Sequence, residues 1–110
     1  MSGDTSSPRE VYVLRDPRSC FAHYVGIAID SKIRLHHHLM RRNAPTSAWI
    51  RELKALGLTP RMEVVDTSIP WAERHGRERQ WIEAFIEADH PLVNSYLNPR
   101  YRKPPPQRAA

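Results

Sequence analysis

The sequence predicts one small α/β (α+β) domain, with a three-stranded antiparallel or mixed sheet flanked by helices in the order β-β-α-α-β-α. Three observations predict it. Short β-branched and aromatic runs alternate with longer stretches whose apolar residues recur at helical spacing. The 110 residues suffice for one compact domain and are too few for two. The composition, 26% charged and 40% hydrophobic, is that of an ordinary globular protein.

The first two elements are predicted to be strands joined by a tight turn. Glu10–Arg15 and Phe21–Ile27 are rich in β-branched and aromatic residues, with Gly26 near the end of the second. Between them, Asp16-Pro17-Arg18-Ser19 has turn chemistry, because proline presets φ and aspartate can bond its own backbone. A connection this short predicts an antiparallel hairpin.

Two helices are predicted to follow the hairpin. Asp30 or Ser31 can cap the first, which we expect to run to about Arg42. The second is expected over Ser47–Leu56, with its apolar residues on one stripe and Gly57 as its stop.

The last two elements are predicted to be a strand and a long helix. Arg61–Asp66 is expected to form the third strand. The helix is expected to begin at Ser68 or Ile69, with Pro70 in its first turn, and to end at about Ala88.

The chain is expected to divide into an ordered domain and two disordered ends. Residues 1–8 are small and polar, and residues 98–110 are rich in proline and arginine, which leaves 9–97 as the domain. The net charge is +5, but the domain and the N-terminus together carry only +1. The remaining charge comes from four bases of the 98–110 segment, called the basic tail below: Arg100, Arg102, Lys103 and Arg108.

Charge and cysteine content narrow the classes of function. A basic segment facing a polyanion is one interpretation of residues 32–61, which hold seven bases and one acid; a solvated helix face with a solubilising tail is the other. No apolar run is long enough to span a bilayer. Cys20 is the only cysteine, which excludes an intrachain disulfide and a cysteine-based zinc cage and fits a cytoplasmic setting.

On a helical wheel, the first helix separates its three histidines. His38 and Arg41 fall within about 40° of Arg34, which predicts a polar ridge with His37 at its edge. His36 falls among the apolar residues and is expected in the core or at its rim. Consecutive histidines point in different directions, so a zinc site would need distant partners such as His23 or Cys20.

The long helix has one carboxylate on its apolar stripe. Glu78 falls with Trp71, Trp81, Ile82 and Phe85. An unpaired buried carboxylate is costly, so we expect a cation beside it, either arginine or a metal ion. The alternatives are an ion pair with Arg34 or Arg74, or a tilted helix that leaves Glu78 at the rim.

Three other polar residues have both a structural and a functional interpretation. Tyr12 and Tyr24 lie on the two hairpin strands, where they either pack with their hydroxyls at a wet edge or place two hydroxyls at one site. Asn94 is by default an Asx turn or a helix cap.

These residues, in this order, resemble the GIY-YIG nuclease domain over residues 10 to about 96. The resemblance rests on Val11-Tyr12-Val13, Tyr24-Val25-Gly26, Arg34 with His38, Glu78, and Asn94. The family's glycine before isoleucine is absent from the first motif.

The resemblance implies metal-dependent hydrolysis of DNA phosphodiester bonds, giving 5′-phosphate and 3′-hydroxyl ends. Glu78 would bind one Mg²⁺, with Mn²⁺ as a substitute, and Arg34 would hold the scissile phosphate. Tyr12 or Tyr24 would deprotonate or position the attacking water, assisted by His38. Asn94 would brace the site, and Gly26 would let the backbone approach it.

The resemblance also implies DNA as the partner, including branched or damaged DNA, with specificity supplied by the surface, a protein partner or a homodimer. The nucleic-acid-binding residues are then expected to be Gly26, Arg34, Arg41, Arg42, Arg100, Arg102 and Lys103. The alternatives are a catalytically silent nucleic-acid-binding module of the same fold and a small partner-binding domain.

Overall fold

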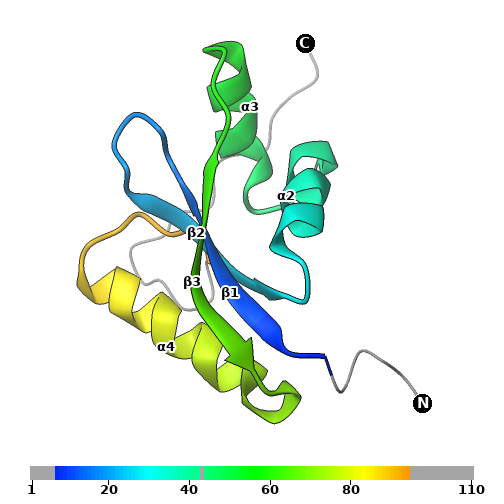
Figure 1. Cartoon of the computed structure of the whole chain (residues 1–110). Coiled ribbons are helices and arrows are strands. Elements are labelled where there is room, and N and C mark those ends of the chain that lie inside the picture. The colour runs from blue at the N-terminus through cyan, green and yellow to red at the C-terminus, as the bar shows by residue number, and fades with distance from the viewer. Residues whose placement is uncertain (1–6, 43, 95–110) are drawn as a thin grey trace.

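The computed structural model describes residues 7–42 and 44–94. It confirms the predicted fold class, a three-stranded antiparallel sheet with helices in the order β-β-α-α-β-α (Figure 1). The elements are β1 (Arg9–Arg15), β2 (Ala22–Ala28), α2 (Ser31–Met40), α3 (Ser47–Ala55), β3 (Arg61–Ile69), the 3-10 turn η1 (Trp71–Glu73) and α4 (Arg74–Glu87).

β1 is the middle strand, between β2 and β3, and it is buried on both faces. Alternate side chains of a strand point to opposite faces, so β1 divides its residues between two cores. Val11 and Val13 pack with Ile82 of α4 on one face. Tyr12 and Leu14 pack with the α3 residues of the other face.

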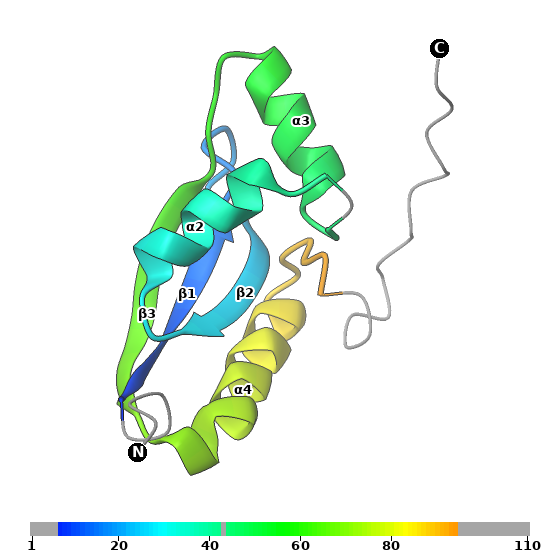
Figure 2. The same ribbon diagram turned by 90° about the vertical axis from the view of Figure 1, so that its right-hand side faces the viewer.

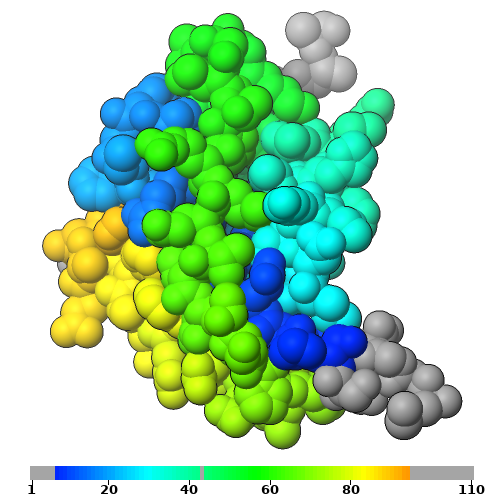
Figure 3. All heavy atoms as spheres, in the orientation of Figure 1, coloured from blue at the N-terminus to red at the C-terminus, as the bar shows by residue number. Residues whose placement is uncertain are grey.

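The helices therefore lie on both sides of the sheet. Figure 2 shows α4 on one side and α2 and α3 on the other, with β2 between α2 and α4. β2 is an edge strand, so side chains from both helices can approach each other around it. β3 is the opposite edge, and its mostly exposed side chains run down the middle of the face in Figure 3.

The predicted start of the long helix is wrong. The third strand continues to Ile69, which pairs with Arg9 of β1, and helical structure begins only with η1 at Trp71. The longer strand is possible because the β1–β3 register shifts near Val11 and because Ser68 adopts a positive φ of 59°. Pro70 precedes η1 with an extended backbone, so it does not lie in the first turn of the helix.

The predicted faces of the first helix are also wrong in part. α2 ends at Met40, and it buries Ser31 and His38, whereas His36 is exposed. A buried histidine needs partners for both ring nitrogens, and His38 has them in Tyr12 and Thr46. Ile33 and Met40, two apolar residues of the same helix, are 54% and 69% exposed.

The predicted helix caps are confirmed where the structure describes them. Asp30 Oδ1 accepts hydrogen bonds from the backbone N–H groups of Lys32 and Ile33 at the start of α2. Gly57 follows α3 with a φ of 73°, a conformation that glycine adopts without steric cost.

The two predicted disordered ends lie mostly outside the described residues, and so does the basic tail with Arg100, Arg102, Lys103 and Arg108. Within the described ranges, no helix has the length and apolar character that crossing a membrane requires.

Candidate functional site

Tyr12, His38 and Tyr24 form one aromatic cluster. The fully buried Tyr12 hydroxyl lies 2.8 Å from His38 Nε2, and the other ring nitrogen of His38 lies 3.3 Å from Thr46 Oγ1. The half-buried Tyr24 ring stands edge-on to His38, with ring centroids 4.8 Å apart. The hairpin and α2 thus bring two phenols and an imidazole together.

Gly26 is the residue that makes room for Tyr12. The two residues face each other in the β1–β2 register. A Cβ atom built on Gly26 would lie 2.4 Å from both Cζ and the hydroxyl oxygen of Tyr12. The Tyr12 ring therefore occupies the space that any other side chain would need at position 26.

Burial shifts the pKa values of Tyr12 and His38 in this cluster. It raises the pKa of Tyr12 above its ordinary value, and Tyr24 and Glu78 act in the same direction, whereas Arg34 opposes them. Burial, reinforced by the positive charges of Arg34 and Arg41, lowers the pKa of His38 to about 4. At neutral pH, Tyr12 is therefore protonated and His38 is neutral.

The low pKa of His38 predicts a loss of stability in acid. An unfolded chain protonates this imidazole near its ordinary pKa of 6.5, whereas the folded chain resists protonation until about pH 4. Stability therefore falls as the pH drops through 6.5, and the loss is complete below 4. We expect His38→Gln to remove about 2 kcal/mol of the decrease in unfolding free energy between pH 7 and pH 4.5. Urea unfolding at a series of pH values measures this.

The matched control is His36→Gln, two residues away on the exposed side of α2. It should keep the pH dependence of the wild type. The pKa values of His23 and His90 are also lowered by burial, but their contributions are present in all three proteins and cancel in the comparison. Equal pH slopes for wild type and His38→Gln would contradict the assignment.

Arg34 and Glu78 extend the cluster to the other side of β2. Glu78 lies half-buried on α4, and burial raises the pKa of its carboxyl, which the charges of His75 and Arg34 oppose. The charge of Arg34 also acts on Tyr12 and on His38. Tyr12, Tyr24, Arg34, His38 and Glu78 thus lie within electrostatic reach of one another, directly or through Arg34.

Glu78 does not form the ion pair with arginine that was one of the alternatives from the sequence. Among residues 7–42 and 44–94, neither Arg34 nor Arg74 forms an ion pair with it. The same part of the chain holds no group of three or more histidine, cysteine, aspartate or glutamate side chains placed to bind a metal ion. Glu78 is therefore a single carboxylate, and Mg²⁺ often takes one or two carboxylates and completes its shell with water and phosphate oxygens.

Asn94 supports the strand that carries Tyr24 and Gly26. Its Oδ1 accepts from the backbone N–H of Val25 at 3.0 Å, and its Nδ2 donates to the carbonyl of Val25 at 2.9 Å. The buried amide thus bonds the edge of β2 as a neighbouring strand would. It is neither an Asx turn nor a helix cap in these contacts.

The other predicted binding residues are more dispersed. Arg41 and Arg42 are exposed just after α2, where Arg41 acts on the pKa of His38 and the Arg42 carbonyl accepts from Arg51. Arg100, Arg102 and Lys103 fall outside the part of the chain that the structure describes. Comparisons with protein families, with curated proteins and with solved structures find no match to this chain.

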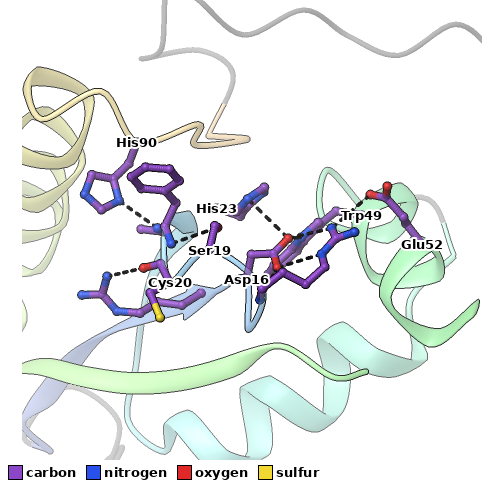
Figure 4. A network of polar contacts seen from close by, with 11 residues as sticks. Asp16, Ser19, Cys20, His23, Trp49, Glu52 and His90 are labelled. Atoms are coloured by element: carbon purple, nitrogen blue, oxygen red, sulfur yellow. Dashed lines mark hydrogen bonds and ion pairs between the residues drawn. The ribbon is translucent and has the colours of Figure 1, made fainter. Parts of the chain in front are cut away.

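A second polar cluster lies at the hairpin turn (Figure 4). The buried Asp16 accepts from the backbone and side chain of Arg18 and, at 3.1 Å, from Nε1 of Trp49. Hydrogen bonds from Arg18 hold the pKa of Asp16 well below its usual range. His23 stacks flat on Trp49, with centroids 4.5 Å apart. These bonds join the turn to α3, so we assign this cluster to structure.

Sequence reasoning missed Thr46 and Arg9, and it offered Arg74 as a partner of Glu78, whereas Arg74 lies over Trp71. Thr46 binds His38 from the segment between the helices, and nothing in an Asn-Ala-Pro-Thr break indicates such a contact. Arg9 and Arg74 flank Trp71, with guanidinium carbons 4.6 and 3.3 Å from its ring centroid. Arg9 lies one residue before the predicted strand, and only the full length of β3 brings it to Trp71.

Proposed function

We propose that this protein is a metal-dependent DNA endonuclease of the GIY-YIG type. One observation carries the proposal, the gathering of five residues from four elements around β2. Tyr12 and Tyr24 both contact His38, and the charges of Arg34 and Glu78 both act on Tyr12. A binding module would not call for a half-buried carboxylate beside the cation that meets phosphate, because that charge repels DNA.

Arg34 is the phosphate-binding group in this proposal. It is exposed, and it forms no ion pair with a described residue. A guanidinium binds phosphate through charge-assisted hydrogen bonds and balances the negative charge that develops in the transition state. Arg34 therefore holds the scissile phosphodiester next to the tyrosines.

We infer different tasks for the two tyrosines from their burial. Tyr12 is fully buried and engaged with His38, so its hydroxyl is shielded from bulk water. Tyr24 is half-buried at the same cluster, so we propose that its hydroxyl contacts the attacking water. Tyr12 is then a positioning residue, which holds the neutral imidazole of His38 against Tyr24 while Thr46 holds the other ring nitrogen.

Glu78 is the residue that would hold the metal ion. Its half-buried carboxylate has no ion-pair partner among the described residues, and a cation there would offset the cost of its burial. When bound, Mg²⁺ or Mn²⁺ would stabilise the charge on the leaving 3′ oxygen. The products would be 5′-phosphate and 3′-hydroxyl ends.

DNA is the proposed partner, and the cytoplasm the proposed location. Arg41, Arg42 and the basic tail are expected to add affinity that does not depend on sequence, because they neutralise phosphates and release counterions. We propose that a protein partner or a second copy supplies further specificity.

The test is cleavage of supercoiled plasmid by the purified full chain. We expect nicking in Mg²⁺ or Mn²⁺ and none in EDTA. A filter-binding titration at several salt concentrations runs beside it, because phosphate contacts weaken steeply as salt rises. Salt-dependent binding without nicking would favour the catalytically silent module instead. An affinity that does not fall as the salt concentration rises would contradict both the nuclease and the silent binding module.

A further inference from the structure

A pocket of about 470 Å³ adjoins the candidate site. Its lining residues belong to the start of β1, the end of β2, the start of α2, η1 and the start of α4. Its size is in the range of pockets that hold small organic ligands. Arg34, the proposed phosphate ligand, lines it, so an occupant would be an immediate neighbour of the scissile phosphate.

The pocket combines cations with apolar walls. Arg9, Arg34 and Arg74 contribute guanidinium groups, and Ile27, Ile33 and Trp71 contribute apolar surface. The one carboxylate in the lining, Asp30, already accepts two backbone N–H groups as the cap of α2. The lining therefore favours a ligand that is anionic at one end and apolar at the other.

Trp71 holds two of these cations in place. The guanidinium of Arg74 lies 3.3 Å from the ring centroid, and its Nη1 donates to the Trp71 carbonyl at 2.7 Å. Arg9 lies 4.6 Å from the same centroid. Such cation–π contacts fix flexible side chains before a ligand arrives, which reduces the entropy lost on binding.

A phosphate ligand would use the cations of the pocket but not its apolar walls. A nucleobase would contact the apolar walls, and it can also stack on guanidinium planes, as unpaired bases do. A base inside a duplex cannot enter a pocket, because its faces are covered by its neighbours in the stack. The ligand that fits both the charge and the apolar surface is a nucleotide whose base is unpaired.

We propose that this pocket binds one unpaired nucleotide next to the cleaved phosphodiester bond, so that the preferred substrate is DNA with a locally unpaired base. The proposal rests on the proposed function for its choice of DNA. It identifies the substrate class by structure rather than by sequence, because the walls offer stacking surface and charge.

The test measures binding in EDTA, where no cleavage occurs. Two fluorescently labelled DNA duplexes differ only in one unpaired thymidine at the centre of the second. We expect the wild-type chain to bind the second duplex about tenfold more tightly, the lower part of what one stacked base contributes. Thymidine 5′-monophosphate is added as a competitor in a further arm, and we expect it to compete only at concentrations far above those of the DNA.

The variant Ile33→Trp is designed to fill the pocket with a larger side chain, and Met40→Trp is its matched control. Both positions are exposed apolar residues of α2, but only Ile33 lines the pocket. Ile33→Trp should lose the preference for the unpaired base and keep its affinity for the perfect duplex. Met40→Trp should keep the preference.

A second pair of variants tests the charge. Arg74→Gln should reduce the preference, whereas Arg79→Gln should not, because Arg79 is 65% exposed and pairs with Glu83 on α4. The absence of any preference in the wild type would overturn the proposal, as would a preference that survives in Ile33→Trp. If thymidine 5′-monophosphate competed at the same concentrations as the DNA, the proposal would also be overturned, and the pocket would be a site for free nucleotides.

These outcomes are separate from those of the plasmid assay. Nicking without a preference for the unpaired base would leave the nuclease proposal standing and reject the pocket. A preference without nicking would retain the pocket and reject the nuclease.

Discussion

Glu78→Gln is expected to abolish metal-dependent nicking of supercoiled DNA, by at least about a hundredfold in rate. Glutamine keeps the shape of the side chain but removes the charge that would hold the cation. The measurement is the initial rate of conversion to open circles in Mg²⁺ and in Mn²⁺. Neither ion should support nicking by the variant, because the substitution removes the metal ligand rather than altering the preference between metals.

The same substitution is expected to leave the fold intact. Burial raises the pKa of Glu78, which means that the folded protein disfavours its ionised form. Removing that charge should leave the unfolding free energy unchanged or slightly higher. DNA binding in EDTA should be unchanged or tighter, because a negative charge near Arg34 is gone. Lost nicking therefore cannot be ascribed to unfolding.

The matched control for this prediction is Glu87→Gln. Glu87 is exposed at the last position of α4. The Glu87→Gln variant should nick supercoiled DNA at the wild-type rate. Equal rates for Glu78→Gln and Glu87→Gln would remove Glu78 from the reaction, and the function proposed for this protein would then lose its metal ligand.

Gly26→Ala is expected to damage both stability and activity. The new methyl group would lie 2.4 Å from two atoms of Tyr12, whose ring is fully buried and bonded to His38. The ring must therefore move, and overpacking of this kind costs about 1–3 kcal/mol. The displaced hydroxyl would also leave His38. Urea unfolding and plasmid nicking measure the two effects.

Gly76→Ala is the control for the glycine change. Gly76 lies within α4, and an added Cβ meets nothing within 4 Å. Alanine is the better helix former, so this variant should be about 0.5–1 kcal/mol more stable than the wild type. A Gly26→Ala protein as stable as the wild type would show that the Tyr12 ring is free to move.

Apolar spacing predicted α3 because that helix buries one face: Trp49, Ile50 and Leu53 recur at helical spacing, and they are buried. β1 was predicted from its β-branched and aromatic residues instead, and these residues pack into cores on both faces of the sheet. The same reasoning failed where polar contacts override hydrophobicity, as at His38, which two hydrogen bonds allow to be buried.

The arrangement of the candidate site was harder to predict from sequence patterns than the secondary structure. The resemblance named Tyr12, Tyr24, Arg34, His38, Glu78 and Asn94, but it did not indicate that Tyr12 is fully buried and Tyr24 only half-buried. That difference depends on which side chain covers Gly26, and so on strand register. Thr46 and Arg9 reach their partners through tertiary contacts between distant segments, which a single sequence does not encode in any local pattern.

The contact between Asn94 and β2 has a consequence for self-association. An exposed strand edge offers unpaired N–H and carbonyl groups to any other chain. On β2, the amide of Asn94 occupies both groups of Val25, and the N–H of Val93 takes the carbonyl of His23. On β3, the exposed charges of Arg61 and Glu63 disfavour pairing with a neighbour. Each edge of the three-stranded sheet thus carries a feature that disfavours aggregation.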